Sequence, residues 1–181
     1  MSAEGELVSL QHLERIDLLH PIIQASAHEL VTRCQSSLKR TLLVVQGWRS
    51  LNDQALIYQK GRTLNRSTGV WEITDAPQVV TRAKPGTSAH NIVRVATGAP
   101  ASMALDVIPL NDDGTIDWQP DETFWDDLYE IAWKVGLDPL GDPIGSSLAG
   151  DMGHFEEPAF RLKMEALGVM FPLLKSERTF A

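Results

Sequence analysis

The stretch Ala104-Leu105-Asp106-Val107-Ile108 is a short apolar run interrupted by one carboxylate. Short runs of aliphatic and β-branched residues bounded by turn-forming residues are typical of buried strands. Burying a carboxylate is costly unless it is paired with a cation or bound to a metal ion. The run therefore predicts a core strand, and Asp106 is its candidate functional residue.

Further strands and helices are predicted on both sides of that run. Thr41–Gln46 is β-rich and apolar, which predicts a second buried strand. Residues 17–40 have the apolar spacing of an amphipathic helix, and Pro21 fits near its first turn. Ser50 is a suitable N-cap for a helix that ends at Tyr58.

The remaining elements are expected along the rest of the chain. Residues 121–135 have helical spacing, and Gly136 is the natural residue to end that helix. The other expectations are a short strand at 79–81, a turn at 111–114, a loop at 141–150, a strand end at 152–155 and a last helix at 158–167.

This order of elements predicts an α+β fold, with a small, mostly antiparallel sheet and helices packed on it. The chain has 181 residues, of which 43% are hydrophobic, so it is long enough for one sizeable core. No internal repeat or dividing linker is evident. We expect one domain over residues 1–181, in which the first ~15 residues are flexible.

Charge and cysteine content exclude several classes of protein. The formal net charge of −8 argues against a nucleic-acid partner and against an anionic membrane surface. No secretory signal and no apolar run of ~20 residues is found, so we expect synthesis in the cytoplasm without a signal peptide. Cys34 is the single cysteine and has helical apolar neighbours, which predicts a buried, unreactive thiol.

The five histidines fall into two groups. His12, His20 and His28 lie in the N-terminal helical region, where we expect surface or satisfied helix residues rather than ligands. His90 and His154 are flanked by small residues, which leave space for a ligand to approach.

His90, His154 and Asp106 together form a donor set suited to catalytic zinc. Two imidazoles and one carboxylate leave the fourth tetrahedral position open for water. On spacing alone, an Asp106 that caps a turn or pairs with an arginine is equally consistent with the sequence.

Three ordered motifs carry a resemblance to a known family. They are Ser88-x-His90-Asn91, Ala104-x-Asp106 and Asp151-x-x-His154-Phe155-Glu156. Upstream, Gln46-Gly47-Trp48-Arg49-Ser50 is followed by Gln54, Tyr58 and Gly61-Arg62-Thr63. Over roughly residues 21–158 the chain resembles the zinc D-alanyl-D-alanine carboxypeptidase and L-alanyl-D-glutamate peptidase family, because the order and number of these individually weak motifs agree.

The resemblance implies a role for each matching residue. His90, Asp106 and His154 would hold one catalytic Zn²⁺. Asp151 falls at the position of the general base. Arg49 falls at the position of an arginine that holds a substrate carboxylate or the developing oxyanion. Ser88 and Gln54 are the implied substrate-binding residues.

Two departures from the family pattern are present. The spacing from His90 to Asp106 is longer than usual, so residues 91–102 contain an insertion, which we expect as a loop beside the cleft. Aspartate at 151 is shorter than the more common glutamate. Glu156 or Glu157 is an alternative base, although both follow the ligand His154.

The resemblance implies a zinc metallopeptidase that hydrolyses the stem peptide of peptidoglycan. We expect a monomeric L-alanyl-D-glutamate endopeptidase of the phage or prophage endolysin type, which reaches the wall in the periplasm after release, for example through a holin. One alternative is a D-alanyl-D-alanine carboxypeptidase with the same metal site. Another, from a different class, is a non-catalytic zinc-bearing binding module or phage structural module.

Overall fold

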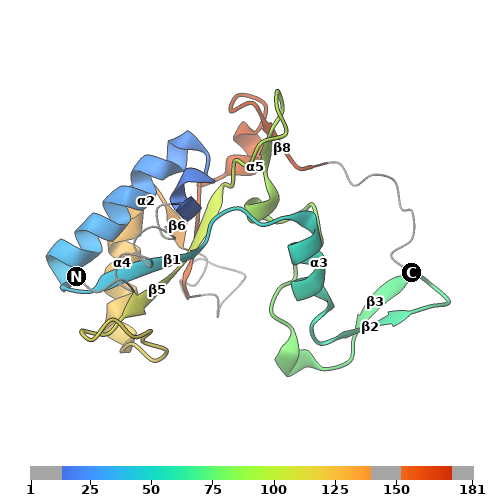
Figure 1. Ribbon diagram of the computed structural model, residues 1–181, viewed down its shortest axis with the longest axis horizontal. Helices are drawn as coiled ribbons and strands as arrows, with labels where there is room; N and C mark the ends of the chain where they lie inside the picture. Colours follow the sequence, from blue (N-terminus) through green and yellow to red (C-terminus); the bar gives the residue numbers. More distant parts are fainter. Residues whose placement is uncertain (1–13, 140–151, 173–181) are drawn as a thin grey trace.

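A four-stranded antiparallel sheet forms the centre of the fold (Figure 1). The computed structural model describes residues 14–139 and 152–172. The strands are β1 (Thr41–Gln46), β5 (Ala104–Leu110), β7 (His154–Glu156) and β6 (Asp138–Pro139), in the order β1-β5-β7-β6. The predicted α+β class with an antiparallel sheet is confirmed, as are the strands at 41–46 and 104–108.

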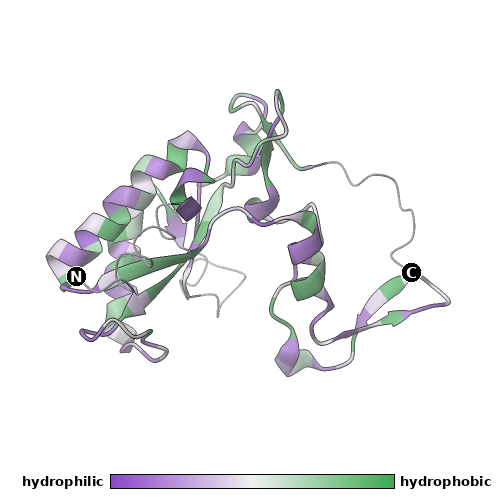
Figure 2. Ribbon diagram, viewed as in Figure 1, coloured by the Kyte–Doolittle hydropathy of each residue, from purple (hydrophilic) through white to green (hydrophobic). Residues whose placement is uncertain are grey.

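Two helices and the sheet enclose the main core. These are α2 (Pro21–Arg33), which continues as the π-helix η1 (Cys34–Leu38), and α4 (Glu122–Lys134). Leu105 and Val107 of β5 point into this core with residues of both helices. Side chains alternate across a strand, so Asp106 projects from the opposite face of β5. Apolar residues accordingly colour most of β1 and β5 in Figure 2.

The helices begin at or next to residues that the sequence indicated as first-turn or capping positions, although α2 is shorter than the predicted helix at 17–40. Pro21 is the first residue of α2. Ser50 accepts a hydrogen bond from the amide of Asp53 and so caps α3 (Leu51–Gln59). Asp121 caps α4 in the same way, and Gly136 follows that helix at φ 84°. Cys34 is buried, as predicted.

A hairpin extends away from the central sheet and was not predicted (Figure 1). It consists of β2 (Arg62–Asn65) and β3 (Val70–Ile73), followed by the 3₁₀ turn η2 (Ala76–Gln78). The Oδ1 atom of Asn65 accepts from the amide of Ser67 and so forms the turn. The predicted strand at 79–81 is wrong, because the Val79 amide bonds to the 3₁₀ turn instead.

The insertion at 91–102 is packed rather than a free loop. Its strand β4 (Val93–Arg94) pairs with β8 (Val169–Met170). A second apolar cluster lies beneath this pair. It comprises Ala89, Ile92, Ala101, Met103, Ala104, Phe160 and Val169.

The C-terminal elements are shorter than expected. β7 begins at His154 rather than 152, since residues 152 and 153 form a turn. The last helix, α5, covers only Phe160–Lys163, because it follows Ala159 in the left-handed region at φ 52°. The predicted N-terminal flexibility, the loop at 141–150 and Asp151 lie outside the described residues. Within 14–139 and 152–172, no helix is both long and apolar enough to cross a bilayer.

Candidate metal centre

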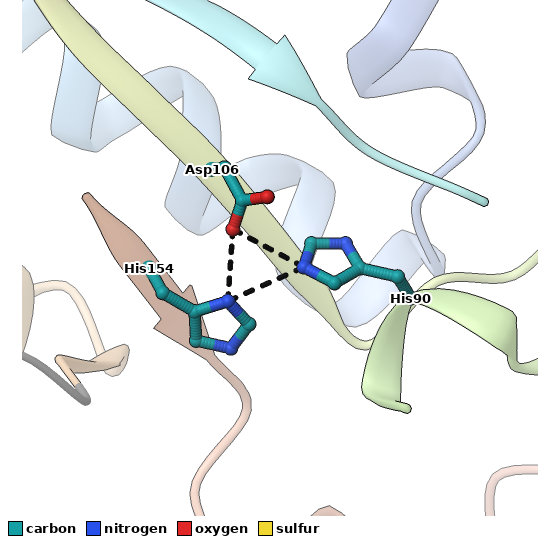
Figure 3. A group of neighbouring side chains, drawn as sticks. All are labelled: His90, Asp106 and His154. Carbon is teal, nitrogen blue, oxygen red and sulfur yellow. Dashed lines mark hydrogen bonds and ion pairs between the residues drawn. The ribbon is translucent and has the colours of Figure 1, made fainter. Parts of the chain in front are cut away.

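His90, Asp106 and His154 meet at one point above the sheet (Figure 3). His90 comes from the 3₁₀ turn η3 (Ala89–Asn91), Asp106 from β5 and His154 from β7. Asp106 and His154 are direct partners in the β5–β7 register. The three predicted ligands are therefore brought together by adjacent strands and one turn. We call this group the metal centre.

The spacing of the three atoms fits a zinc ion. His90 Nε2 lies 3.1 Å from Asp106 Oδ1 and 3.2 Å from His154 Nδ1, and the third edge is 2.8 Å. Zinc–nitrogen bonds of ~2.0–2.1 Å in a tetrahedron place neighbouring ligand atoms ~3.3 Å apart. Two imidazole nitrogens and a carboxylate oxygen are also the donor types that zinc prefers.

A backbone carbonyl orients the His90 ring. Nδ1 of His90 lies 2.7 Å from the carbonyl oxygen of Gly47. A carbonyl only accepts, so Nδ1 carries a proton, and Nε2 is the ring nitrogen that faces the centre and can serve as a ligand once it has lost its own proton. The backbone at residue 47 also packs closely against the Arg15 segment, where a Cβ would lie 2.3 Å from the carbonyl oxygen of Arg15, so this position requires glycine.

His154 is supported from both sides. Its Nε2 atom faces Oε2 of Glu156 at 3.6 Å, so the second nitrogen of each histidine faces an oxygen. Before it in the chain, Gly153 lies against β5, where a Cβ would be 2.3 Å from the carbonyl oxygen of Val107. The hydroxyl of Tyr129 donates to the carbonyl of Met152 at 3.1 Å and ties this turn to α4.

The pKa of Asp106 is held well below its ordinary value. Burial alone would raise the pKa of this carboxyl, but the charge of His90 and hydrogen bonds from both histidines outweigh burial.

Opposite Asp106, the β1–β5 register shifts between Val44 and Gln46. Such bulges re-aim strands next to functional sites.

Asp106 also pairs with an arginine, as one reading of the sequence allowed, while its role as a metal ligand stays a prediction. Its Oδ2 atom lies 3.3 Å from Nη2 of Arg49. Nη1 of Arg49 donates to Oε1 of Gln54 at 3.0 Å, and Nε2 of Gln54 donates to the carbonyl of Ala83 at 2.8 Å. Gln54 is fully buried, so in this structure its side chain positions Arg49. Its predicted contact with substrate stays a prediction.

Asn91 was missed by the sequence reasoning as a supporting residue. Its Nδ2 atom donates to the carbonyl of Arg49 at 2.9 Å, and its Oδ1 atom accepts from the amide of Gly86 at 3.0 Å. The amide of Arg49 in turn donates to the carbonyl of His90 at 2.9 Å. The fully buried Asn91 thus joins the arginine segment to the histidine turn. Its position next to His90 in the motif was the available signal.

The other predicted residues are placed as follows. The hydroxyl of Ser88 caps η3 by accepting from the amide of His90, and its role toward substrate stays a prediction. Oε1 of Glu157 accepts from Nζ of Lys163 at 2.7 Å. His20 caps α2 away from the metal centre, and burial lowers the pKa of its ring. Asp151 lies outside the described residues.

Comparisons with known proteins support the fold. No family model matches the chain, and no curated protein is similar to it in sequence. A mutant of VanY, a vancomycin resistance D,D-pentapeptidase from a VanB-type cassette in complex with Zn(II), aligns with a TM-score of 0.51. The two chains are 15% identical over 82% of this chain and 78% of that chain. The chain therefore has the fold of this pentapeptidase.

A second solved structure is also similar. The L-Ala D-Glu endopeptidase ChiX of Serratia marcescens aligns with a TM-score of 0.49 and 16% identity. The alignment covers 83% of this chain and 87% of that chain.

Proposed function

We propose that this chain is a zinc-dependent peptidase that hydrolyses the stem peptide of bacterial peptidoglycan. The observation that carries the proposal is the convergence of one atom each from His90, Asp106 and His154, all within 4.8 Å of one another. A partly buried ion pair between Arg49 and Asp106 adjoins these atoms. The order of the sequence motifs and the fold shared with VanY support the same assignment.

Each residue of the centre has a chemical task in this proposal. His90, Asp106 and His154 hold the ion, which supplies Lewis-acid chemistry and a nucleophilic water near neutral pH. Arg49 holds a substrate carboxylate or the oxyanion that develops on the scissile carbonyl. Gln54 and Asp106 fix its guanidinium on two sides, so Arg49 is oriented before substrate binds.

Asp151 is the proposed general base, which takes a proton from water and passes it to the leaving amine. The alternatives are less suitable because both glutamates are engaged elsewhere. Glu157 is paired with Lys163, and the carboxylate of Glu156 lies against Nε2 of His154, the ring nitrogen that does not face the centre.

For the scissile bond, we favour L-alanyl-D-glutamate, and for the biological role a phage or prophage endolysin. The segment Gln46-Gly47-Trp48-Arg49 of the family resemblance supports this choice. The enzyme would act as a monomer on the wall in the periplasm after release through a holin. A D-alanyl-D-alanine carboxypeptidase is the second candidate, since VanY, whose fold the chain shares, is a D,D-pentapeptidase.

Mass spectrometry of digests of two defined stem peptides tests the proposal. One peptide ends in D-Ala-D-Ala and the other lacks both terminal residues. Cleavage of both between L-Ala and D-Glu supports the endopeptidase. Release of D-Ala from the first alone supports the carboxypeptidase. If the zinc-loaded protein cuts neither peptide nor purified peptidoglycan, the proposal fails and a binding module is favoured.

A further inference from the structure

The exposed hairpin and the segments that join it form a cationic region of an acidic protein. We call residues 60–84 the arm; they include β2, β3 and η2 (Figure 1). The arm contains five basic and two acidic side chains, a net charge of +3 in a chain whose formal charge is −8. Charge is therefore distributed unevenly, and the arm is attractive to anions.

The basic side chains of the arm are not neutralised within the described part of the chain. Elsewhere, five basic residues form ion pairs with carboxylates: Arg33, Arg40, Arg49, Lys134 and Lys163. None of the basic residues of the arm forms an ion pair with a described residue. Four of them are exposed: Lys60, Arg66, Arg82 and Lys84.

The arm is fixed in place although little covers it. Arg62 donates to the carbonyls of Tyr58 and Thr81, and its guanidinium lies 4.1 Å from the centre of the Tyr58 ring. This joins the end of α3 to the segment that returns from the hairpin. An isolated hairpin is marginally stable, so these contacts hold its direction.

The arm is also connected to the metal centre. Arg82 and Lys84 flank Ala83, whose carbonyl accepts from Gln54, and Gln54 in turn holds Arg49 beside Asp106. A cationic path therefore begins next to the catalytic arginine and continues along the returning segment to the hairpin. Three apolar side chains on the arm, Val70, Ile73 and Val80, are more than half exposed.

We propose that the arm binds the anionic, peptide-bearing polymer of the cell wall and so holds the insoluble substrate at the metal centre. This inference rests on the proposed function, which names the polymer. Its stem peptides carry free carboxylates that suit the unpaired Lys and Arg side chains, and alanine methyl groups that suit the exposed apolar ones. Complementary charge speeds encounter and weakens with salt, so the acidic remainder of the protein does not prevent binding.

Two matched triple variants test the proposal. The arm variant carries Arg66→Gln, Arg82→Gln and Lys84→Gln. The control variant carries Arg33→Gln, Lys39→Asn and Lys134→Gln, which are exposed positions on or beside α2 and α4 and change the net charge equally. Binding to purified insoluble sacculi is measured by pelleting over a range of salt concentrations, and hydrolysis is measured on sacculi and on a soluble stem pentapeptide.

We expect the arm variant to bind sacculi about tenfold more weakly than the wild type, with a flatter dependence on salt. Its loss of hydrolysis on sacculi should exceed its loss on the soluble peptide by a similar factor, while the control variant behaves as the wild type. Equal binding of sacculi by the arm variant and the wild type would overturn the proposal, as would an equal loss in the control. Binding of both variants to phosphatidylglycerol vesicles is measured in parallel. If the arm variant loses binding to the vesicles but not to sacculi, the proposal is overturned in favour of a membrane. If the wild type cuts no stem peptide, the proposed function fails, while pelleting still decides whether the arm binds the wall.

Discussion

Nδ1 of His90 donates a hydrogen bond of 2.7 Å to the carbonyl oxygen of Gly47, and this contact decides which nitrogen of the ring faces Asp106. The acceptor belongs to the residue two before Arg49. One short segment therefore orients a predicted metal ligand through its backbone and, in Arg49, supplies the predicted catalytic side chain. Support of this kind is a known determinant of metal affinity.

Gly47→Ala should weaken metal binding without touching a ligand. The new Cβ would lie 2.3 Å from the carbonyl oxygen of Arg15, so the backbone must shift and the carbonyl of Gly47 must move relative to His90. We expect zinc affinity to fall ~10–100-fold, as for loss of other supporting contacts. Competition with a chromophoric chelator measures it. Gly69→Asn is the control, since Gly69 has open space around it; an unchanged affinity in Gly47→Ala would contradict the assignment.

Removing a ligand should abolish both the bound ion and the stability that it confers. The wild-type protein should gain ~2.7 kcal/mol of unfolding free energy when free zinc is 100 times its dissociation constant. His90→Ala and His154→Ala should gain little, because their centres lack a donor. Thermal melts with zinc and with a chelator measure this. His28→Ala, on the exposed face of α2, should respond as the wild type. An equal zinc response in all three variants would place the ion elsewhere.

A double-mutant cycle should show that Gln54 acts through Arg49. We expect Arg49→Ala to lower kcat/KM ~10²–10³-fold, as for loss of an oxyanion donor. Gln54→Leu should lower it less and leave zinc content unchanged. In the Arg49→Ala background, Gln54→Leu should have almost no further effect, since the group that Gln54 holds is gone. Independent, multiplicative effects would instead mean that Gln54 stabilises the fold or contacts substrate itself.

Cys34 should make the fold less stable in alkaline solution. Burial raises the pKa of its thiol from 9.0 to about 11, although Arg40 opposes this shift. The folded protein therefore keeps a proton that the unfolded chain releases. The contribution is complete below pH 9 and is lost from there toward pH 11, at up to about 1.4 kcal/mol per unit. Urea unfolding of wild type and Cys34→Ala over this range measures the difference. Parallel pH profiles would contradict it.

The central strands and helix caps were predictable because local signals and burial agree there. Ser50, Asp121 and Pro21 act on the first turn of the helix that each one begins, and β1 is apolar from Leu42 to Val45. The hairpin was missed because β2 and β3 contain no buried residue and lack the alternating apolar pattern of a half-buried strand. Its turn signal at Asn65 was present, but strands without a core face give little support to it.

The candidate metal centre was likewise only partly predictable from the sequence. His90, Asp106 and His154 were recognisable as a donor set because their residue types and flanking small residues have chemical meaning. The supporting contacts were not recognisable, since they depend on register and backbone approach. The carbonyl of Gly47 and the side chain of Asn91 meet their partners only after the segments at 47–49 and 86–91 lie side by side.

Titration of metal-free protein with zinc, followed by hydrolysis of a soluble stem pentapeptide, tests the central claim most directly. The account predicts that activity rises in proportion to added zinc and reaches a plateau at one ion per chain. His154→Ala should remain inactive throughout while keeping its fold. Activity that is complete in the presence of a strong chelator, or that persists in His154→Ala, would contradict the assignment of this centre.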